Sequence, residues 1–114
     1  MSELSFRQHD EGDWHIIRLD GCVDAHTFTN LEEELTRLVE QGKYKIKLDL
    51  EKRTYVNSAG LGLLLATHRQ LRQHGGKLVI EKVSYKISNI LNLLGFSRLM
   101  DNDDEGLAGV AVRR

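Results

Sequence analysis

The sequence predicts an α/β fold, in which helices cover a β-sheet, and three observations support this prediction. Segments in which apolar and polar residues alternate, as in strands, take turns with segments whose apolar residues recur every three or four positions, as in amphipathic helices. Glycines follow the helical segments, at Gly42, Gly75 and Gly95. None of the 114 residues is a proline, so no element is interrupted. Strands that alternate with crossover helices are typical of α/β sheets.

The N-terminal part is expected to form two strands and a helix. Residues 4–8 alternate in the manner of a strand, and a turn cluster at residues 10–13 reverses the chain into a second strand over residues 14–19, with a short extension at residues 22–23. Residues 27–41 follow with helical periodicity. The apolar positions of this helix are Phe28, Leu31, Leu35, Leu38 and Val39.

The same alternation continues along the rest of the chain. Residues 44–50 form a strictly alternating strand, whose apolar face carries Tyr44, Ile46, Leu48 and Leu50. A second helix has an apolar stripe that begins at Leu61, and a further strand spans residues 77–81. Ser84 caps a third helix, with expected buried positions at Ile87, Ile90, Leu91 and Leu94. An acidic loop and a final apolar run occupy residues 101–112.

Length and composition limit the possible functions. A chain of 114 residues is long enough for one domain with its own core, which we expect to span residues 1–114. Sixteen basic and seventeen acidic residues give a formal charge of −1, which argues against nucleic acid or anionic membranes as partners bound through bulk charge. No apolar run approaches the ~20 residues that cross a bilayer, so we expect no membrane anchor. The single cysteine, Cys22, and the lack of a secretory pattern at the start indicate a cytoplasmic protein.

Ser58 lies between a strand and a helix, in the stretch YVNSAGLG at residues 55–62. A serine in this place is most often a helix N-cap, whose hydroxyl accepts a hydrogen bond from a free backbone N–H. Asn57 is equally able to cap the helix, so one of the two polar residues is available for another role.

A catalytic serine is disfavoured by its surroundings. Gly60 has the spacing found after the serine of a nucleophile elbow, but Val56 occupies the position of the glycine that should precede it. His68 and His74 lie at least ten residues further along the same helix, about 15 Å away at 1.5 Å per residue, and therefore cannot reach the Ser58 hydroxyl. We expect no catalytic residue.

Nucleotide and metal sites have no better support. Leu65 stands where the third glycine of a GxGxxG pattern belongs, so Gly60 and Gly62 alone do not indicate a phosphate-binding loop. The acidic loop begins like a calcium loop, yet Val112 replaces the glutamate at its twelfth position. The five histidines show no zinc-ligand spacing with Cys22. We therefore expect neither a cofactor nor a metal.

The remaining possibility is that Ser58 is a phosphorylation site. A phosphate at a helix N-terminus meets free N–H groups and the positive end of the helix dipole, so the fold accommodates it. About two negative charges would appear beside Asp24, where they repel an acidic partner surface. Such repulsion costs several kcal/mol, and ~4 kcal/mol corresponds to about a thousandfold in affinity. One hydroxyl group would be sufficient to switch a complex.

The stretch 55–62 resembles the phosphorylation segment of bacterial anti-sigma factor antagonists, the small single-domain members of the STAS family. Residues 19–24, LDGCVD, are similar to the glycine-then-aspartate turn that follows the second strand in this family, and the likeness extends to residues 75–78 and 93–96. It covers nearly the whole chain in the same order.

The resemblance implies an α/β STAS fold, with a four- or five-stranded mixed sheet and helices packed mainly on one side, and a function without catalysis. In such proteins the unphosphorylated form binds an anti-sigma factor that is also a serine kinase; phosphorylation releases the antagonist, and a serine phosphatase resets the cycle. By position, Ser58 would be the phosphoacceptor. The residues of the implied partner surface are Asp24, Asn57, Ala59, Gly60 and Leu61.

One position departs from the family pattern and favours a second hypothesis. The family usually has aspartate directly before the phosphoacceptor, and Asn57 stands there, able to cap but uncharged. The alternative is a constitutive structural or accessory STAS subunit, similar to those of stressosome assemblies and lipid-transport complexes, which needs no phosphorylation. Such a subunit should expose a large apolar patch. The candidates for it are Phe96, Leu99 and Met100. Gly60 and Gly62 are expected to let backbone segments approach closely.

Overall fold

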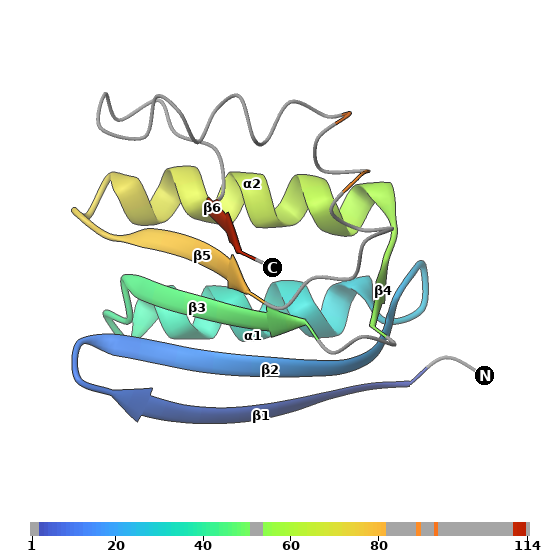
Figure 1. Cartoon of the computed structure of the whole chain (residues 1–114), viewed down its shortest axis with the longest axis horizontal. Helices are drawn as coiled ribbons and strands as arrows, with labels where there is room; N and C mark the ends of the chain where they lie inside the picture. Colours follow the sequence, from blue (N-terminus) through green and yellow to red (C-terminus); the bar gives the residue numbers. More distant parts are fainter. Residues whose placement is uncertain (1–2, 51–53, 82–88, 90–92, 94–110, 114) are drawn as a thin grey trace.

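The computed structural model describes residues 3–50, 54–81, 89, 93 and 111–113. In chain order its elements are β1 (Leu4–Glu11), β2 (Trp14–Val23), α1 (Phe28–Glu40), β3 (Lys45–Leu50), β4 (Tyr55–Val56), α2 (Ser58–Arg72), β5 (Lys77–Glu81) and β6 (Ala111–Arg113) (Figure 1). The α/β class and the order of the strands and helices up to residue 81 agree with the prediction.

The strands form one mixed sheet in the order β1-β2-β3-β5-β6. β1 and β2 are antiparallel, whereas the β2–β3, β3–β5 and β5–β6 pairs are parallel. The short strand β4 lies off this path and pairs in parallel with the end of β2. The mixed sheet implied by the resemblance is therefore confirmed, and β4 is an additional strand that the sequence patterns did not predict.

Both helices lie on the same side of the sheet. α1 connects β2 to its parallel neighbour β3, and α2 connects β3 to its parallel neighbour β5. Both crossovers run in the same direction across the sheet, so the right-handed rule places both helices on one face. α1 and α2 contact each other there, behind the sheet in the view of Figure 1. The predicted third helix, at residues 84–94, lies mostly outside the described residues.

The core lies between the sheet and the two helices. Register brings Ile17, Leu48 and Ile80 into one row across β2, β3 and β5, and all three are fully buried. The helices contribute Leu31, Leu35, Leu38, Leu61, Leu64 and Leu71. Each such side chain stabilises the fold by roughly 1.5–3 kcal/mol relative to its exposed state. The predicted apolar face of residues 44–50 is confirmed, because Ile46 and Leu48 are buried and Tyr44 packs against this core. The opposite face is not wholly exposed as predicted, since Asp49 is buried as well.

Two element boundaries differ from the prediction. β1 continues to Glu11, so only residues 12–13 form the turn, in which Gly12 has φ +59°. Asp10 belongs to the strand because it pairs with His15 of β2, and its carboxylate contacts the side chains of His15 and Lys43. β2 continues through Gly21 to Val23 as one strand of ten residues.

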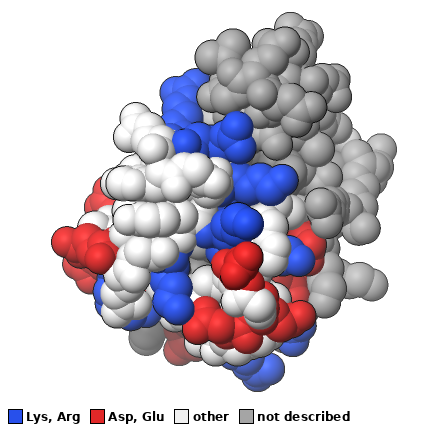
Figure 2. All heavy atoms as spheres, turned by 90° about the vertical axis from the view of Figure 1, so that its left-hand side faces the viewer, with Lys and Arg blue, Asp and Glu red and all other residues white. Residues whose placement is uncertain are grey.

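The end of the molecule that carries the β1–β2 turn has charges of both signs. Figure 2 shows a run of Lys and Arg side chains there, with Asp and Glu side chains next to it. Lys43 Nζ lies 3.0 Å from Asp10 Oδ2, and Lys45 Nζ lies 3.9 Å from Asp13 Oδ2. None of the helices among the described residues has the length and apolar character needed to cross a membrane.

Candidate functional site

Ser58 is the first residue of α2, and its side chain is exposed. The N-cap of this helix is Asn57, whose Oδ1 accepts a hydrogen bond from the Gly60 N–H at 2.7 Å. The interpretation of Ser58 as the cap is therefore wrong, and the second polar residue performs that role. Within the described part of the chain, the Ser58 hydroxyl has no hydrogen-bond partner.

The start of α2 is held tightly against the end of β2. The Asn57 N–H donates to the Val23 carbonyl at 2.9 Å, and Val23 pairs with Val56 of β4. A Cβ atom at Gly60 would lie 2.7 Å from Val56 Cγ1 and 2.8 Å from Val23 Cγ1. A close approach is thus found at Gly60, but with the side chains of two valines and not with another backbone segment as expected. The expectation is wrong at Gly62, where a Cβ atom would meet nothing within 4 Å.

Asp24 shapes the loop between β2 and α1. Its Oδ1 accepts from the backbone N–H groups of His26 at 2.9 Å and Thr27 at 3.2 Å. Thr27 is the N-cap of α1 but makes no capping bond with its own side chain; its Oγ1 donates instead to the Cys22 carbonyl. Asp24 thus has a structural role that the sequence pattern did not indicate.

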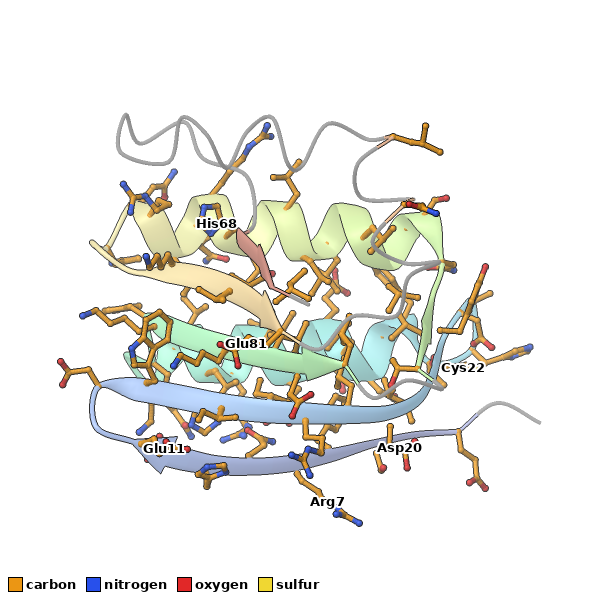
Figure 3. All side chains as sticks on the ribbon, viewed as in Figure 1. Arg7, Glu11, Asp20, Cys22, His68 and Glu81 are labelled. Atoms are coloured by element: carbon orange, nitrogen blue, oxygen red, sulfur yellow. The ribbon has the colours of Figure 1, made fainter. Side chains whose placement is uncertain are left out.

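The structure brings most of the predicted site residues to one end of the sheet. The β2–α1 loop and the start of α2 lie together there (Figure 1), because β2 and β4 are paired. Figure 3 shows Cys22 at this end and Glu11 at the opposite end. Asp24 and Asn57 are half-buried, and Ser58 and Ala59 are exposed.

Two residues predicted to contact the partner protein are buried. Gly60 is buried, and the Leu61 side chain is 0% exposed, in the core. Both residues therefore lie under the exposed residues Ser58 and Ala59 and are not part of the molecular surface. The binding roles of Asp24, Asn57 and Ala59 stay predictions.

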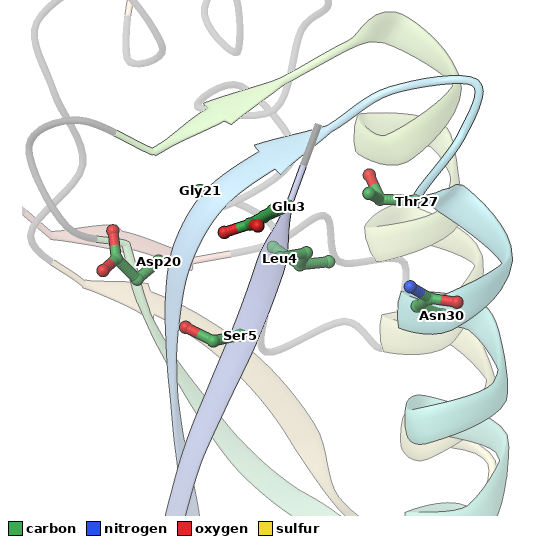
Figure 4. A pocket seen from close by; sticks show the side chains of 7 residues that line it. All are labelled: Glu3, Leu4, Ser5, Asp20, Gly21, Thr27 and Asn30. Carbon is green, nitrogen blue, oxygen red and sulfur yellow. The ribbon is translucent and has the colours of Figure 1, made fainter. Parts of the chain in front are cut away.

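A hollow of about 510 Å³ lies beside the Asp24 loop (Figure 4). It is lined by Glu3, Leu4, Ser5, Asp20, Gly21, Thr27 and Asn30. Gly21 is required here: its φ is +118°, and a Cβ atom would lie only 2.1 Å from the Glu3 carbonyl oxygen. The Cys22 N–H donates to the same oxygen at 3.0 Å. This close contact between Glu3 and Gly21 positions the end of β2, which is followed by Asp24.

The two candidate histidines for a hydrolase, His68 and His74, have other contacts. His68 is buried between α2 and β5, where its Nδ1 accepts from the Leu78 N–H at 3.0 Å (Figure 3). The His74 ring stacks on Tyr44, with centroids 4.3 Å apart. Ten residues of helix, about 15 Å, separate His68 from Ser58. Among the described residues no three His, Cys, Asp or Glu side chains are grouped as metal ligands; the acidic loop at 101–106 lies outside them.

Comparison with known sequences identifies relatives of this chain. Residues 6–106 match the profile of the STAS domain. The chain is 32% identical over 92 residues to the anti-sigma-B factor antagonist of Staphylococcus epidermidis, a match that covers 81% of this chain and 83% of the relative. It is 31% identical over 97 residues to the anti-sigma-B factor antagonist of Staphylococcus aureus, covering 85% and 90%.

Solved structures share the fold. An anti-sigma factor antagonist from Mycobacterium paratuberculosis superposes with a TM-score of 0.74 at 20% identity, covering 84% of this chain and 81% of that one. The anti-sigma factor antagonist SpoIIAA in its unphosphorylated form has a TM-score of 0.65 at 22% identity, covering 78% and 83%. The phosphorylated form of the Bacillus SpoIIAA has a TM-score of 0.62 at 19% identity, covering 82% and 86%.

Proposed function

Because the chain belongs to the STAS domain family, we propose that it is an anti-sigma factor antagonist that acts by partner switching. In the unphosphorylated form it binds an anti-sigma factor that is also a serine kinase. Phosphorylation of Ser58 ends the complex, and a serine phosphatase restores the binding form. The protein is a cytoplasmic regulator and catalyses no reaction itself.

The observation that carries this proposal is the exposed hydroxyl of Ser58 at the first position of α2, beside a cap that Asn57 provides. A phosphate there would meet backbone N–H groups and the positive end of the helix dipole. The bond between Asn57 and Gly60 does not involve the serine, so the modification leaves the cap in place. SpoIIAA, whose two forms resemble this chain with TM-scores of 0.65 and 0.62, keeps this fold in both.

Release of the partner would follow from charge. Phosphorylation adds about 1.5 to 2 negative charges, next to the loop that carries Asp24. A bound partner surface would then face an excess of negative charge that it did not have to accommodate before. Like-charge contacts of this kind cost several kcal/mol, enough to weaken a complex at least a hundredfold, since each 1.4 kcal/mol is a factor of about ten.

Calorimetry with the serine-kinase anti-sigma factor of the same organism tests the proposal. Ser58→Asp should bind at least tenfold more weakly than the wild type, whereas Ser58→Ala should bind equally well and stay bound when ATP is added. Ala66→Asp is the matched control, because it adds the same charge at an exposed position of the same helix, away from its start. Equal affinities of Ser58→Asp and the wild type would refute the switch.

The residue before Ser58 favours one competing function. Asn57 is neutral and its side chain is engaged as the cap, so a kinase meets no carboxylate at this position. A constitutive structural or accessory subunit would need no phosphorylation, and its candidate apolar patch of Phe96, Leu99 and Met100 lies outside the described residues. A phosphopeptide map from the native cell separates the two functions: phosphate on Ser58 supports the switch, and its absence under all growth conditions supports the permanent subunit.

A further inference from the structure

Tyr55 exposes an aromatic ring at the same end of the molecule as Ser58. It is 43% exposed and, with Leu93, is one of the two large apolar side chains with substantial exposure in the described part of the chain. Monomeric proteins often expose single apolar residues, so exposure alone proves nothing. The position and rigidity of Tyr55 give it significance.

The backbone around Tyr55 is held on both sides. Thr54 Oγ1 donates to the Leu19 carbonyl at 2.9 Å, and the Asn57 N–H donates to the Val23 carbonyl at 2.9 Å. Between these two bonds, Tyr55 pairs with Cys22 in the parallel β2–β4 ladder. The backbone that carries the ring is thus already ordered before binding, so binding does not have to pay for ordering this segment.

The direction of the ring is set by strand alternation. Val56, the other residue of β4, is 1% exposed and packs in the core against the Gly60 backbone. Successive side chains of a strand point to opposite faces, so Tyr55 points outward as long as Val56 points inward. The ring cannot enter the core without removing Val56 from it.

Tyr55 lies close enough to Ser58 for one partner to cover both residues. The two residues are three positions apart, which limits the distance between their Cα atoms to about 11 Å at 3.6 Å per residue. A protein–protein interface of standard size covers about 800 Å² of each partner, a patch roughly 30 Å across. A complex that phosphorylation of Ser58 controls is therefore large enough to include Tyr55 in its interface.

We propose that Tyr55 is the aromatic anchor of this complex and that its ring fills an apolar pocket on the anti-sigma factor. Tyrosine is enriched among the few residues that dominate binding energy, because it has a large apolar ring with few rotamers. Tyr55 provides affinity, while Ser58 provides control. This inference rests on the proposed function, since it names a binding residue for the same partner.

Calorimetric titration of the full-length protein with the anti-sigma factor tests the inference. Tyr55→Ala should bind at least tenfold more weakly, whereas Tyr55→Phe, which keeps the ring, should bind within about threefold of the wild type, and melting curves should show that both variants are folded. If Tyr55→Ala does not fold, Tyr55→Thr removes the ring and keeps a residue that favours strands. Gln70→Ala is the control, because Gln70 is exposed on α2 away from the site.

The outcomes separate this inference from the proposed function. If Tyr55→Ala or Tyr55→Thr binds the anti-sigma factor as tightly as the wild type does, the anchor is overturned, and the proposed switch at Ser58 is unaffected. A loss of affinity in Tyr55→Phe as large as in Tyr55→Ala also overturns it, because the hydroxyl group rather than the ring would then carry the binding. If the wild type itself does not bind the anti-sigma factor, both the proposed function and the anchor fail.

Discussion

Gly60 shows how a single residue determines the geometry of the candidate site. Its missing side chain lets the first turn of α2 approach β2 and β4, with Val23 and Val56 methyl groups in the space that a Cβ atom would occupy. The start of α2 and the end of β2 are neighbours because this approach is close. Gly62, only two residues further along the same helix, has no such function, since a Cβ atom there would meet nothing within 4 Å.

The two glycines give a matched prediction for stability. Gly60→Ala should lower the free energy of unfolding by about 1–3 kcal/mol, because the new methyl group overpacks the contact with two valines. Gly62→Ala should leave it unchanged or raise it by up to about 1 kcal/mol, because alanine favours the helix and meets no neighbour. Urea denaturation of both variants measures the difference. Equal effects at both positions would contradict the close packing at Gly60.

Asp24 allows its charge to be tested separately from its hydrogen bonds. Asp24→Ala removes the acceptor for the His26 and Thr27 N–H groups and should cost about 0.5–2 kcal/mol of stability, as the loss of a cap does. Asp24→Asn keeps an oxygen acceptor and should cost clearly less. Any change in partner affinity in Asp24→Asn then reports on the charge. Thermal unfolding measures the stability of the two variants, and calorimetry measures their affinity for the partner. If Asp24→Asn is as unstable as Asp24→Ala, the lost hydrogen bonds to the Asp24 carboxylate do not explain the loss of stability.

Among the elements, α2 begins with two neighbouring polar residues that have different roles. Asn57 satisfies the Gly60 N–H, and Ser58 remains outside this bond. β4 and the loop after β2 then present this terminus at the surface. The division of roles explains how the helix would retain its cap while the serine is modified.

Variants of Asn57 test this division. Asn57→Ala should destabilise the protein by about 1 kcal/mol, the usual loss for a removed N-cap. Asn57→Asp should retain the cap, add about 0.3–1 kcal/mol through the helix dipole, and increase the rate at which the cognate kinase phosphorylates Ser58. Denaturation and a radiolabelled phosphate assay measure the two effects. An unchanged rate would show that the charge before the phosphoacceptor is irrelevant in this protein.

At the scale of the whole molecule, a polar network connects the hairpin to α1. The Asp10 carboxylate accepts from His15 Nδ1 at 2.7 Å and from Lys43 Nζ at 3.0 Å. These two bonds hold the pKa of Asp10 below its ordinary value of 3.8, and the bond with His15 has the larger effect. Glu34 on α1 accepts from Arg37 and from Gln8 of β1. The bond from Arg37 is the main reason that the pKa of Glu34 lies below its ordinary value of 4.5, although partial burial opposes the shift.

The network predicts a loss of stability in acid. A carboxylate whose pKa is lower in the folded state stabilises the fold above its unfolded pKa, and this contribution is lost as the pH falls through the folded value. The free energy of unfolding should therefore be insensitive to these groups above about pH 5. It should fall as the pH drops below the ordinary values of 4.5 and 3.8.

A variant checks the origin of this acid dependence. The double variant Asp10→Asn, Glu34→Gln should have a flatter profile between pH 5 and pH 3 in urea denaturation. Both residues lie away from Ser58, so the affinity of the double variant for the anti-sigma factor should equal that of the wild type. A profile with the same slope as the wild type would assign the acid dependence to other carboxylates.

Sequence patterns alone were enough to predict the class of fold, most elements and the position of the candidate serine. Local periodicity shows which side chains of a segment become buried. This was sufficient to predict α1 and β3 and the burial of Ile46 and Leu48. The pattern YVNSAGLG likewise placed Ser58 at a helix start. These features depend on residues that are close together in the chain.

The assembly of the site, by contrast, depends on contacts between distant segments of the folded chain. The pairing of β4 with the end of β2 joins segments more than thirty residues apart, and no local pattern indicates which strands pair. That pairing brings Asp24 to Ser58, encloses Leu61 and leaves Tyr55 outside. The choice of Asn57 over Ser58 as the cap likewise depends on where the backbone enters the helix. The physical reason is that burial and hydrogen bonding at this end of the sheet arise from contacts between distant segments, which exist only in the folded chain.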